Sequence, residues 1–242
     1  MIVDKAYKIS IFGDYNDIVA TAENMQFMLD KFGSMGLLPT TFQELVMSEQ
    51  LQPPISYQRL ALISGDGLKK VTIASNRLDF DIQISGDWRL SSEQISEYNR
   101  EMSDVLKVIL EKFSQKSSRL ALNTSSLIVE LNEQEIHAFL DKFTNPLSVY
   151  HEPLEEWATH MMIRRDFMIG GNQEKVNVIT EIEKTEIEKS ENDKLLQAVG
   201  FSVYCDINTI AENILKRFNG DDILTFAVAA SSCWNEIVAD VG

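Results

Sequence analysis

The sequence has little of what metal-binding and redox proteins depend on. Its 242 residues include only two cysteines and three histidines, and no Cys-x-x-Cys spacing occurs. Both cysteines, Cys205 and Cys233, stand in apolar stretches, which is typical of buried free thiols in a reducing compartment. The sequence therefore excludes cysteine-based metal and redox motifs, and we expect no cofactor.

Long hydrophobic runs are also missing. No apolar stretch approaches the ~18 residues that are needed to span a bilayer. The N-terminal segment 1–5 has no basic region followed by an apolar core, which a secretory signal requires. We therefore expect a cytoplasmic protein with no membrane partner.

Basic side chains are scarce and scattered. Lysine and arginine number 22 against 37 aspartates and glutamates, which gives a formal net charge of -15, and the only Arg-Arg pair is Arg164-Arg165. Because the phosphates of nucleic acids need a basic surface, we do not expect free nucleic acid as a ligand. The acidity favours solubility; the alternative is an acidic face that meets a basic partner or mimics DNA.

Hydrophobic periodicity indicates both strands and helices. Residues 78–84 alternate between apolar and polar side chains, which predicts a strand with one buried face. Residues 95–113 carry an apolar stripe at helical spacing, with Ser91 or Ser92 as the N-cap. Asn132 is expected to cap a short helix, and a further helix is predicted over residues 208–218. We predict an α+β fold in which antiparallel meander sheets are flanked by helices.

The predicted elements fall into two halves, 1–117 and 118–242. Each half contains a strand, a helix, several antiparallel strands and a long helix. The last strand of each meander also ends similarly, in Asp79-Phe80-Asp81-Ile82 and in Tyr204-Cys205-Asp206-Ile207. Chance alternation, which is common in α+β proteins, is the favoured explanation of this pattern, and a divergent duplication is the alternative. The halves are expected to form either one compact domain or two lobes.

The densest group of potential ligands spans residues 151–160. Pro153 suits the start of a helix, and on a helix Glu156 and His160 share one face, as ligands of a divalent metal do. The usual two-histidine motif is absent, because His151 precedes the expected helix. Polar surface residues are the favoured interpretation, with Glu156 and His160 as weak metal candidates and no assigned catalytic residue.

Two other acidic segments invite comparison with known sites. Asp79, Asp81 and Asp87 resemble the carboxylates that hold Mg²⁺ in nucleases, but strand alternation explains the first two as the solvated side of a strand. The charged strand 175–189 has Glu or Lys on both faces, which favours an edge strand guarded against pairing. A projecting hairpin arm that meets a partner is the alternative.

The C-terminal third contains the strand Gly200–Thr209 with its Asp206-Ile207-Asn208-Thr209 end, and Asn219-Gly220-Asp221-Asp222 before the last helix. In these segments the chain resembles a sporadically distributed bacterial family of uncharacterised proteins of about this length. Residues 77–80 and 119–122 fit the middle of that family loosely. The family has no established activity, so no catalytic residue is carried over. Its patchy distribution implies a mobile-gene or defence context.

Taken together, the residues favour a non-enzymatic protein-interaction subunit. We expect it to bind a protein partner or to self-associate, in a phage-defence or toxin–antitoxin setting. The first alternative is a metal-dependent hydrolase or nuclease that uses Glu156 and His160. The second is a small-molecule sensor with a pocket between the two halves.

Overall fold

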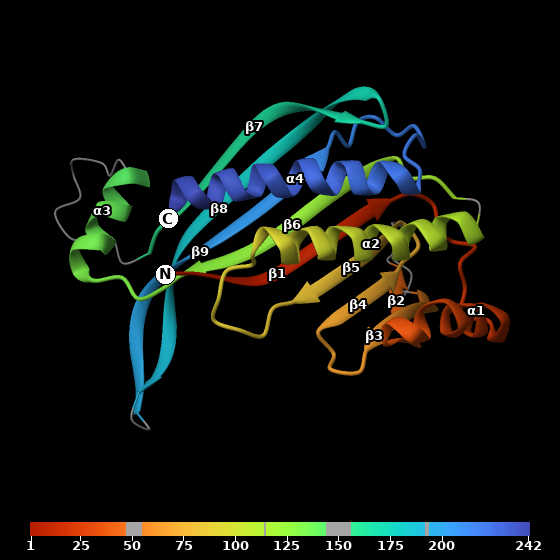
Figure 1. Ribbon diagram of the computed structural model, residues 1–242, viewed down its shortest axis with the longest axis horizontal. Coiled ribbons are helices and arrows are strands. Elements are labelled where there is room, and N and C mark those ends of the chain that lie inside the picture. Colours follow the sequence, from red (N-terminus) through yellow and green to blue (C-terminus); the bar gives the residue numbers. More distant parts are fainter. Residues whose placement is uncertain (47–54, 114, 144–155, 192–193) are drawn as a thin grey trace.

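The computed structural model describes residues 1–46, 55–113, 115–143, 156–191 and 194–242. They contain a nine-stranded antiparallel sheet with the strand order β2-β3-β4-β5-β1-β6-β9-β8-β7 (Figure 1). The strands are β1 (Ile2–Phe12), β2 (Leu37–Val46), β3 (Ile55–Ser64), β4 (Lys69–Ile73), β5 (Arg77–Gln83), β6 (Arg119–Ile128), β7 (Ala158–Ile169), β8 (Asn172–Glu191) and β9 (Lys194–Thr209). The predicted α+β fold with an antiparallel meander is confirmed.

The helices lie mainly on one face of this sheet. They are α1 (Ala22–Phe32), the short 3-10 helix η1 (Gly33–Met35), α2 (Ser92–Lys112), α3 (Glu133–Phe143) and α4 (Gly220–Val241). The two long helices, α2 and α4, cross the same face side by side, while α3 stands at the end of the sheet near the C-terminus (Figure 1). The opposite face of the sheet carries no long helix in the described part of the chain.

The expected helix N-caps explain why two helices begin where they do. The Ser91 hydroxyl accepts a hydrogen bond from the Gln94 backbone N–H at 3.2 Å, and the Gln94 side chain accepts one from the Ser91 N–H at 2.9 Å. Asn132 forms the same reciprocal pair with Glu135, at 3.0 and 2.8 Å. Each pair satisfies backbone N–H groups that a helix start leaves without partners. Both predicted caps are confirmed.

The core lies between the sheet and the two long helices. Tyr7 of β1 is fully buried, and its ring lies 5.6 Å from that of Trp234 in α4. The Tyr7 hydroxyl donates to Asn99 Oδ1 of α2 at 2.6 Å, and Asn99 Nδ2 donates to Ser231 Oγ of α4 at 3.0 Å. A hydrogen-bonded chain therefore joins the sheet to both helices inside an apolar core, where unpaired polar groups would be costly.

The sheet continues across the predicted boundary at residues 117 and 118. β1 and β6, the first strands of the two halves, pair antiparallel at its centre from Ile2↔Ile128 to Phe12↔Arg119. On either side of this pair the remaining strands of each half follow one another, β5 to β2 on one side and β9 to β7 on the other. The duplication remains a prediction, but the halves do share one sheet.

The prediction of a helix over residues 208–218 is wrong. β9 continues to Thr209, a turn follows, and Phe218 forms an isolated bridge with Ser117. Arg217 fixes this segment, because it donates to both carboxylate oxygens of Glu174 at 2.8 and 3.0 Å and also to backbone carbonyls.

In the described part of the chain, no helix has the length and apolar composition that a bilayer crossing requires.

Candidate functional site

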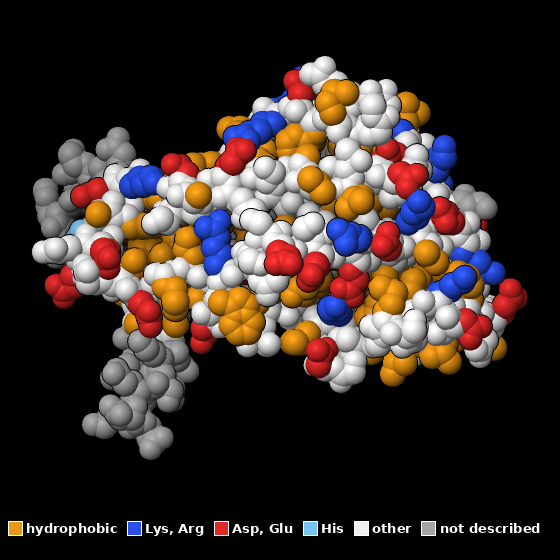
Figure 2. Space-filling view, viewed as in Figure 1, with side chains coloured by type: hydrophobic (Ala, Val, Ile, Leu, Met, Phe, Trp, Pro, Cys, Tyr) orange, Lys and Arg blue, Asp and Glu red, His pale blue; other side chains and the backbone are white. Residues whose placement is uncertain are grey.

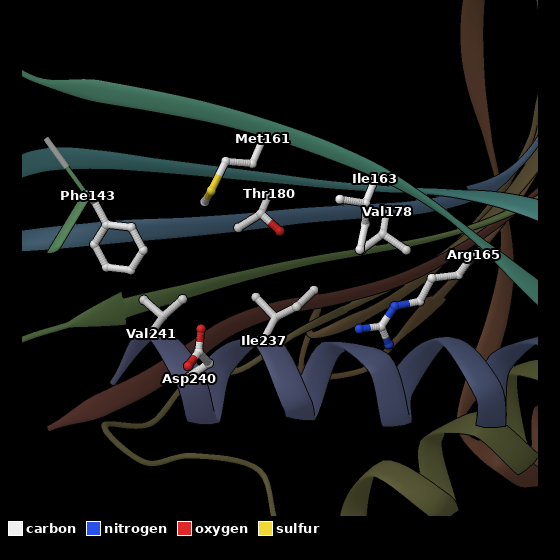
Figure 3. Close-up of a pocket in the computed structure, with 9 residues that line it drawn as sticks. All are labelled: Phe143, Met161, Ile163, Arg165, Val178, Thr180, Ile237, Asp240 and Val241. Atoms are coloured by element: carbon white, nitrogen blue, oxygen red, sulfur yellow. The ribbon is translucent and has the colours of Figure 1, made fainter. Parts of the chain in front are cut away.

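A groove opens on the helix-bearing face where the C-terminal end of α4 runs beside β7 and β8 (Figure 3). Its volume is about 240 Å³. It is lined by Phe143, Met161, Ile163, Arg165, Val178, Thr180, Ile237, Asp240 and Val241. Most of these side chains are apolar, so the groove is suited to apolar groups of a partner.

Strand alternation brings the apolar side chains into the groove. Met161 and Ile163, two residues apart on β7, pair with Thr180 and Val178 of β8 and point to the same face (Figure 3). The β8 pair is buried, since Val178 is 3% exposed and Thr180 6%. The β7 pair is not, because Met161 is 40% exposed and Ile163 52%. The groove is therefore open to solvent along β7.

Arg165 closes one end of the groove. Its Nη1 donates to Glu236 Oε2 at 2.8 Å and to Cys233 Sγ at 3.4 Å, and the hydrogen bond to Glu236 raises the pKa of the guanidinium. Burial raises the pKa of the Cys233 thiol, although the charge of Arg165 opposes that shift. Cys205 is also buried, and burial raises its pKa to about 11. Both thiols are free and held protonated, which disfavours nucleophilic chemistry at either one.

β7 forms one edge of the sheet, and no described residue pairs with the outer side of its backbone. The six consecutive residues 161–166 are all exposed, so neither face of the strand is covered there. Figure 2 shows that apolar side chains reach the surface in patches between charged ones on the helix-bearing face. An edge strand offers unpaired N–H and C=O groups, and a long one with apolar side chains is prone to pair with another strand.

The other edge of the sheet, β2, differs in one important respect. Pro39 lies within it, opposite Leu62 of β3. A proline has no N–H to donate and is a common guard of exposed edges. β7 contains no proline along its 12 residues, Ala158–Ile169. β7 is therefore better suited than β2 to pair with another strand.

Charged side chains of β7 on the face away from the helices pair with β8. His160 Nδ1 lies 3.0 Å from Glu181 Oε1, and Asp166 Oδ1 lies 3.2 Å from Lys175 Nζ. Between them Arg164 donates to Asn177 Oδ1 at 3.2 Å. These contacts are exposed, so each contributes little to the free energy of unfolding. They do fix the positions of an imidazole and a carboxylate six residues apart along the edge.

Residues 176–183 of the charged strand 175–189 lie between two neighbouring strands, so the prediction of an edge strand is wrong there. β8 pairs with β9 along its length and with β7 as far as Ala158↔Glu183. Beyond Glu183, β9 is the one described strand that pairs with β8, so residues 184–189 do form an edge, that of the β8–β9 hairpin, which extends past the rest of the sheet (Figure 1). This geometry matches the projecting arm that the sequence left as an alternative.

Glu156 and His160 do not share a helix face, because no helix contains them. His160 lies in β7, and Glu156 lies in a bend just before that strand. His151 and the segment up to residue 155 lie outside the described residues. Among the described residues, no three His, Cys, Asp or Glu side chains gather as a metal site would require.

The acidic residues of the first half separate into two places. Asp79 and Asp81 share a face of β5, and Lys8 Nζ lies 3.5 Å from a carboxylate oxygen of each. Asp79 also accepts from Ser10 Oγ at 2.7 Å and is 4% exposed, so its assignment to a solvated strand side is wrong. Asp87 pairs instead with Lys5 at 3.1 Å, and its side chain is 85% exposed. Lys8 thus lies where a bridging metal would.

The sequence did not single out the apolar side chains of the β7 edge. The only available signal was the apolar run Met161-Met162-Ile163, which breaks the alternation of a half-buried strand. In comparisons with known proteins, no family model, curated protein or solved structure matches this chain.

Proposed function

We propose that this chain is a non-enzymatic interaction subunit that binds protein through the β7 edge. The observation that carries the proposal is the combination of an unblocked edge strand with an apolar groove along it. The six exposed residues from Met161 to Asp166 offer backbone groups at the edge, and Met161 and Ile163 offer apolar contacts beside α4.

The chemistry of such a site is strand addition. An extended segment of the partner adds to β7 through main-chain hydrogen bonds, and its alternate side chains enter the groove. The backbone bonds supply affinity without regard to sequence, while the groove and the charges of Arg164 and Arg165 select among partners. This mode needs no catalytic group.

The volume of the groove supports a protein partner over a small ligand. Pockets for drug-sized molecules are about 300–1,000 Å³ and enclose most of the ligand. The groove here measures about 240 Å³. It also ends on side chains of β7 that are half exposed. A side chain or two of a bound strand fit this space better than a whole metabolite.

Site-specific photo-crosslinking in cells of the source organism tests the proposal. A benzophenone amino acid replaces Ile163 in one variant and Leu45 of the β2 edge in a control, since Leu45 is 65% exposed. We expect a discrete cross-linked product of defined mass from position 163 that is absent from position 45. Equal products from both positions, or none from position 163, would contradict the proposal.

A further inference from the structure

We infer that the protein bound at the β7 edge is a second copy of this chain. The two copies pair β7 to β7 in antiparallel orientation about a two-fold axis at Ile163. This inference rests on the proposed function and names its partner. Because the two-fold axis stands perpendicular to the sheet, the nine-stranded sheet of one copy continues into that of the other.

The length of the strand favours this register. With Ile163 opposite Ile163, residue 158 faces residue 168 of the partner, so all of β7 except its last residue, Ile169, takes part. Residues opposite one another in an antiparallel pair point to the same face. A two-fold axis at Ile163 therefore keeps facing side chains of the two copies on the same face of the sheet. This holds both when the N–H of Ile163 points toward the partner and when it points toward β8.

The charges on the open face are complementary in this register. His160 faces the partner's Asp166, and Asp166 faces the partner's His160. Each copy already pairs His160 with Glu181 and Asp166 with Lys175, at 3.0 and 3.2 Å. Across the junction the side chains therefore read Glu181, His160, then the partner's Asp166 and Lys175, which is a row of alternating sign when the imidazole is protonated.

Neighbouring registers lose this complementarity. A two-fold axis at Arg164 places two guanidinium groups opposite each other, and like charges directly opposite destabilise a strand pair. An axis at Met162 places His160 opposite the partner's Arg164 and leaves Asp166 facing Ala158. The register centred on Ile163 alone opposes the one acidic residue of the strand to its histidine.

The helix-bearing face also gains contacts in this register. Ile163, 52% exposed in the single chain, meets its own copy across the axis. Met161, 40% exposed, faces the aliphatic stem of the partner's Arg165. Both grooves lie on the same side of the joined sheet, so the uncovered apolar side chains of the two copies cover each other.

The size and charge of the contact set its strength. An interface made of two edge strands is smaller than the ~1,600 Å² of a standard complex, so we expect a micromolar dissociation constant. Each chain also carries a formal net charge of -15, which opposes association at low ionic strength. The dimer is therefore studied at about 0.15 M salt, where charges more than ~8 Å apart are screened.

Cross-linking through one introduced cysteine tests the register, because the two native thiols, Cys205 and Cys233, are buried. Opposed residues of an antiparallel pair have Cα atoms about 4.5–5.5 Å apart, within the range of a disulfide. We expect Ile163→Cys to form a disulfide-linked dimer under mild oxidation. In Met168→Cys, an equally accessible control that is 61% exposed, the two thiols are ten residues apart along the joined strands, about 33 Å, and no such dimer is expected. Equal cross-linking of the two variants would overturn the register.

Light scattering on the purified chain tests the dimer itself. At about 100 μM, well above a micromolar dissociation constant, we expect twice the chain mass for the wild type and for the Leu45→Lys control. In Ile163→Lys two ammonium groups oppose each other at the axis, so we expect the dissociation constant to rise at least about tenfold, as measured from the mass over a dilution series from about 100 to about 1 μM. A wild-type monomer at about 100 μM, or an Ile163→Lys dissociation constant equal to that of the wild type, would overturn the inference. A discrete photo-crosslink from position 163 to a different protein would overturn it as well, while leaving the proposed function standing.

Discussion

Trp234→Ala is expected to lower the free energy of unfolding by about 3–5 kcal/mol, the usual cost of removing a large aromatic side chain from a core. Trp234 is 1% exposed and packs against Tyr7 where the sheet meets α4. Its removal leaves a cavity beside the hydrogen-bonded chain that joins Tyr7, Asn99 and Ser231. Denaturant unfolding followed by circular dichroism measures the loss.

Trp88→Ala is the matched control for this substitution. The Trp88 side chain is 50% exposed, so its truncation is expected to cost less than about 1 kcal/mol. A Trp234→Phe variant should retain most of the stability, because the indole Nε1 has no hydrogen-bond partner among the described residues. Similar losses for the two alanine variants would contradict the position assigned to Trp234 in the core.

Asp79→Ala is expected to cost about 2–4 kcal/mol, since it breaks a buried polar network. Asp79 accepts from Ser10 Oγ at 2.7 Å, and the cations of Lys8 and Arg77 lie 3.5 and 2.9 Å from its Oδ2. Without the carboxylate the buried Ser10 hydroxyl loses its acceptor. The free energy of unfolding in urea measures this cost.

Asp87→Ala is the control, because it removes an exposed aspartate whose one ion pair among the described residues is with Lys5, at 3.1 Å. We expect a change below about 0.5 kcal/mol. If Asp79→Ala were equally mild, Asp79 would not be a structural residue. Its low cost would then call for a functional explanation of the carboxylate pair.

The pKa of Asp81 gives a second measurement on the same network. Burial raises this pKa above its usual range, and the nearby charge of Asp79 adds to the rise, while Lys8 opposes it. A carboxyl with a raised folded-state pKa contributes stability that is present below its unfolded pKa and lost as pH rises through the folded value. In Asp79→Ala the pKa of Asp81 should fall, so this loss with rising pH becomes smaller; NMR titration would detect it.

Local signals predicted those elements whose cause is local. The helix over residues 92–112 follows from an apolar stripe and a capping box, and both are contained within its own sequence. The segment 208–218 also has helical signals, but tertiary contacts determine its conformation instead. Ile214 is 81% exposed and Leu215 68%, so these apolar side chains do not pack into the core, while Arg217 binds Glu174.

Strand order depends on contacts that no local pattern encodes. The charges of β8 suggested an edge, yet its partners β7 and β9 flank it over much of its length, and the charged remainder forms the hairpin arm. β7 became the edge because nothing in the described part of the chain pairs with its outer side. The candidate site follows from this order, so the sequence predicted a protein partner without predicting where it binds.

A wrong assignment of local structure likewise explains why Glu156 and His160 were chosen as metal candidates. Glu156 and His160 seemed to share a helix face because Pro153 and the spacing suggested a helix. In a strand, residues four apart also share a face, but they are about 13 Å apart along it. His160 instead meets Glu181 across the strand pair. Sequence spacing alone therefore predicted ligands that the actual backbone separates.

Amide hydrogen exchange of β7 tests the central claim most directly, because it reports whether the edge is covered. Peptides from β7 and from β2 are compared in the wild type at high protein concentration and in Ile163→Lys. A covered edge predicts slower exchange in β7 than in β2, with the difference lost on dilution and in Ile163→Lys. Equal exchange at the two edges, unchanged by dilution or by the substitution, would contradict the claim that a second copy of the chain covers β7.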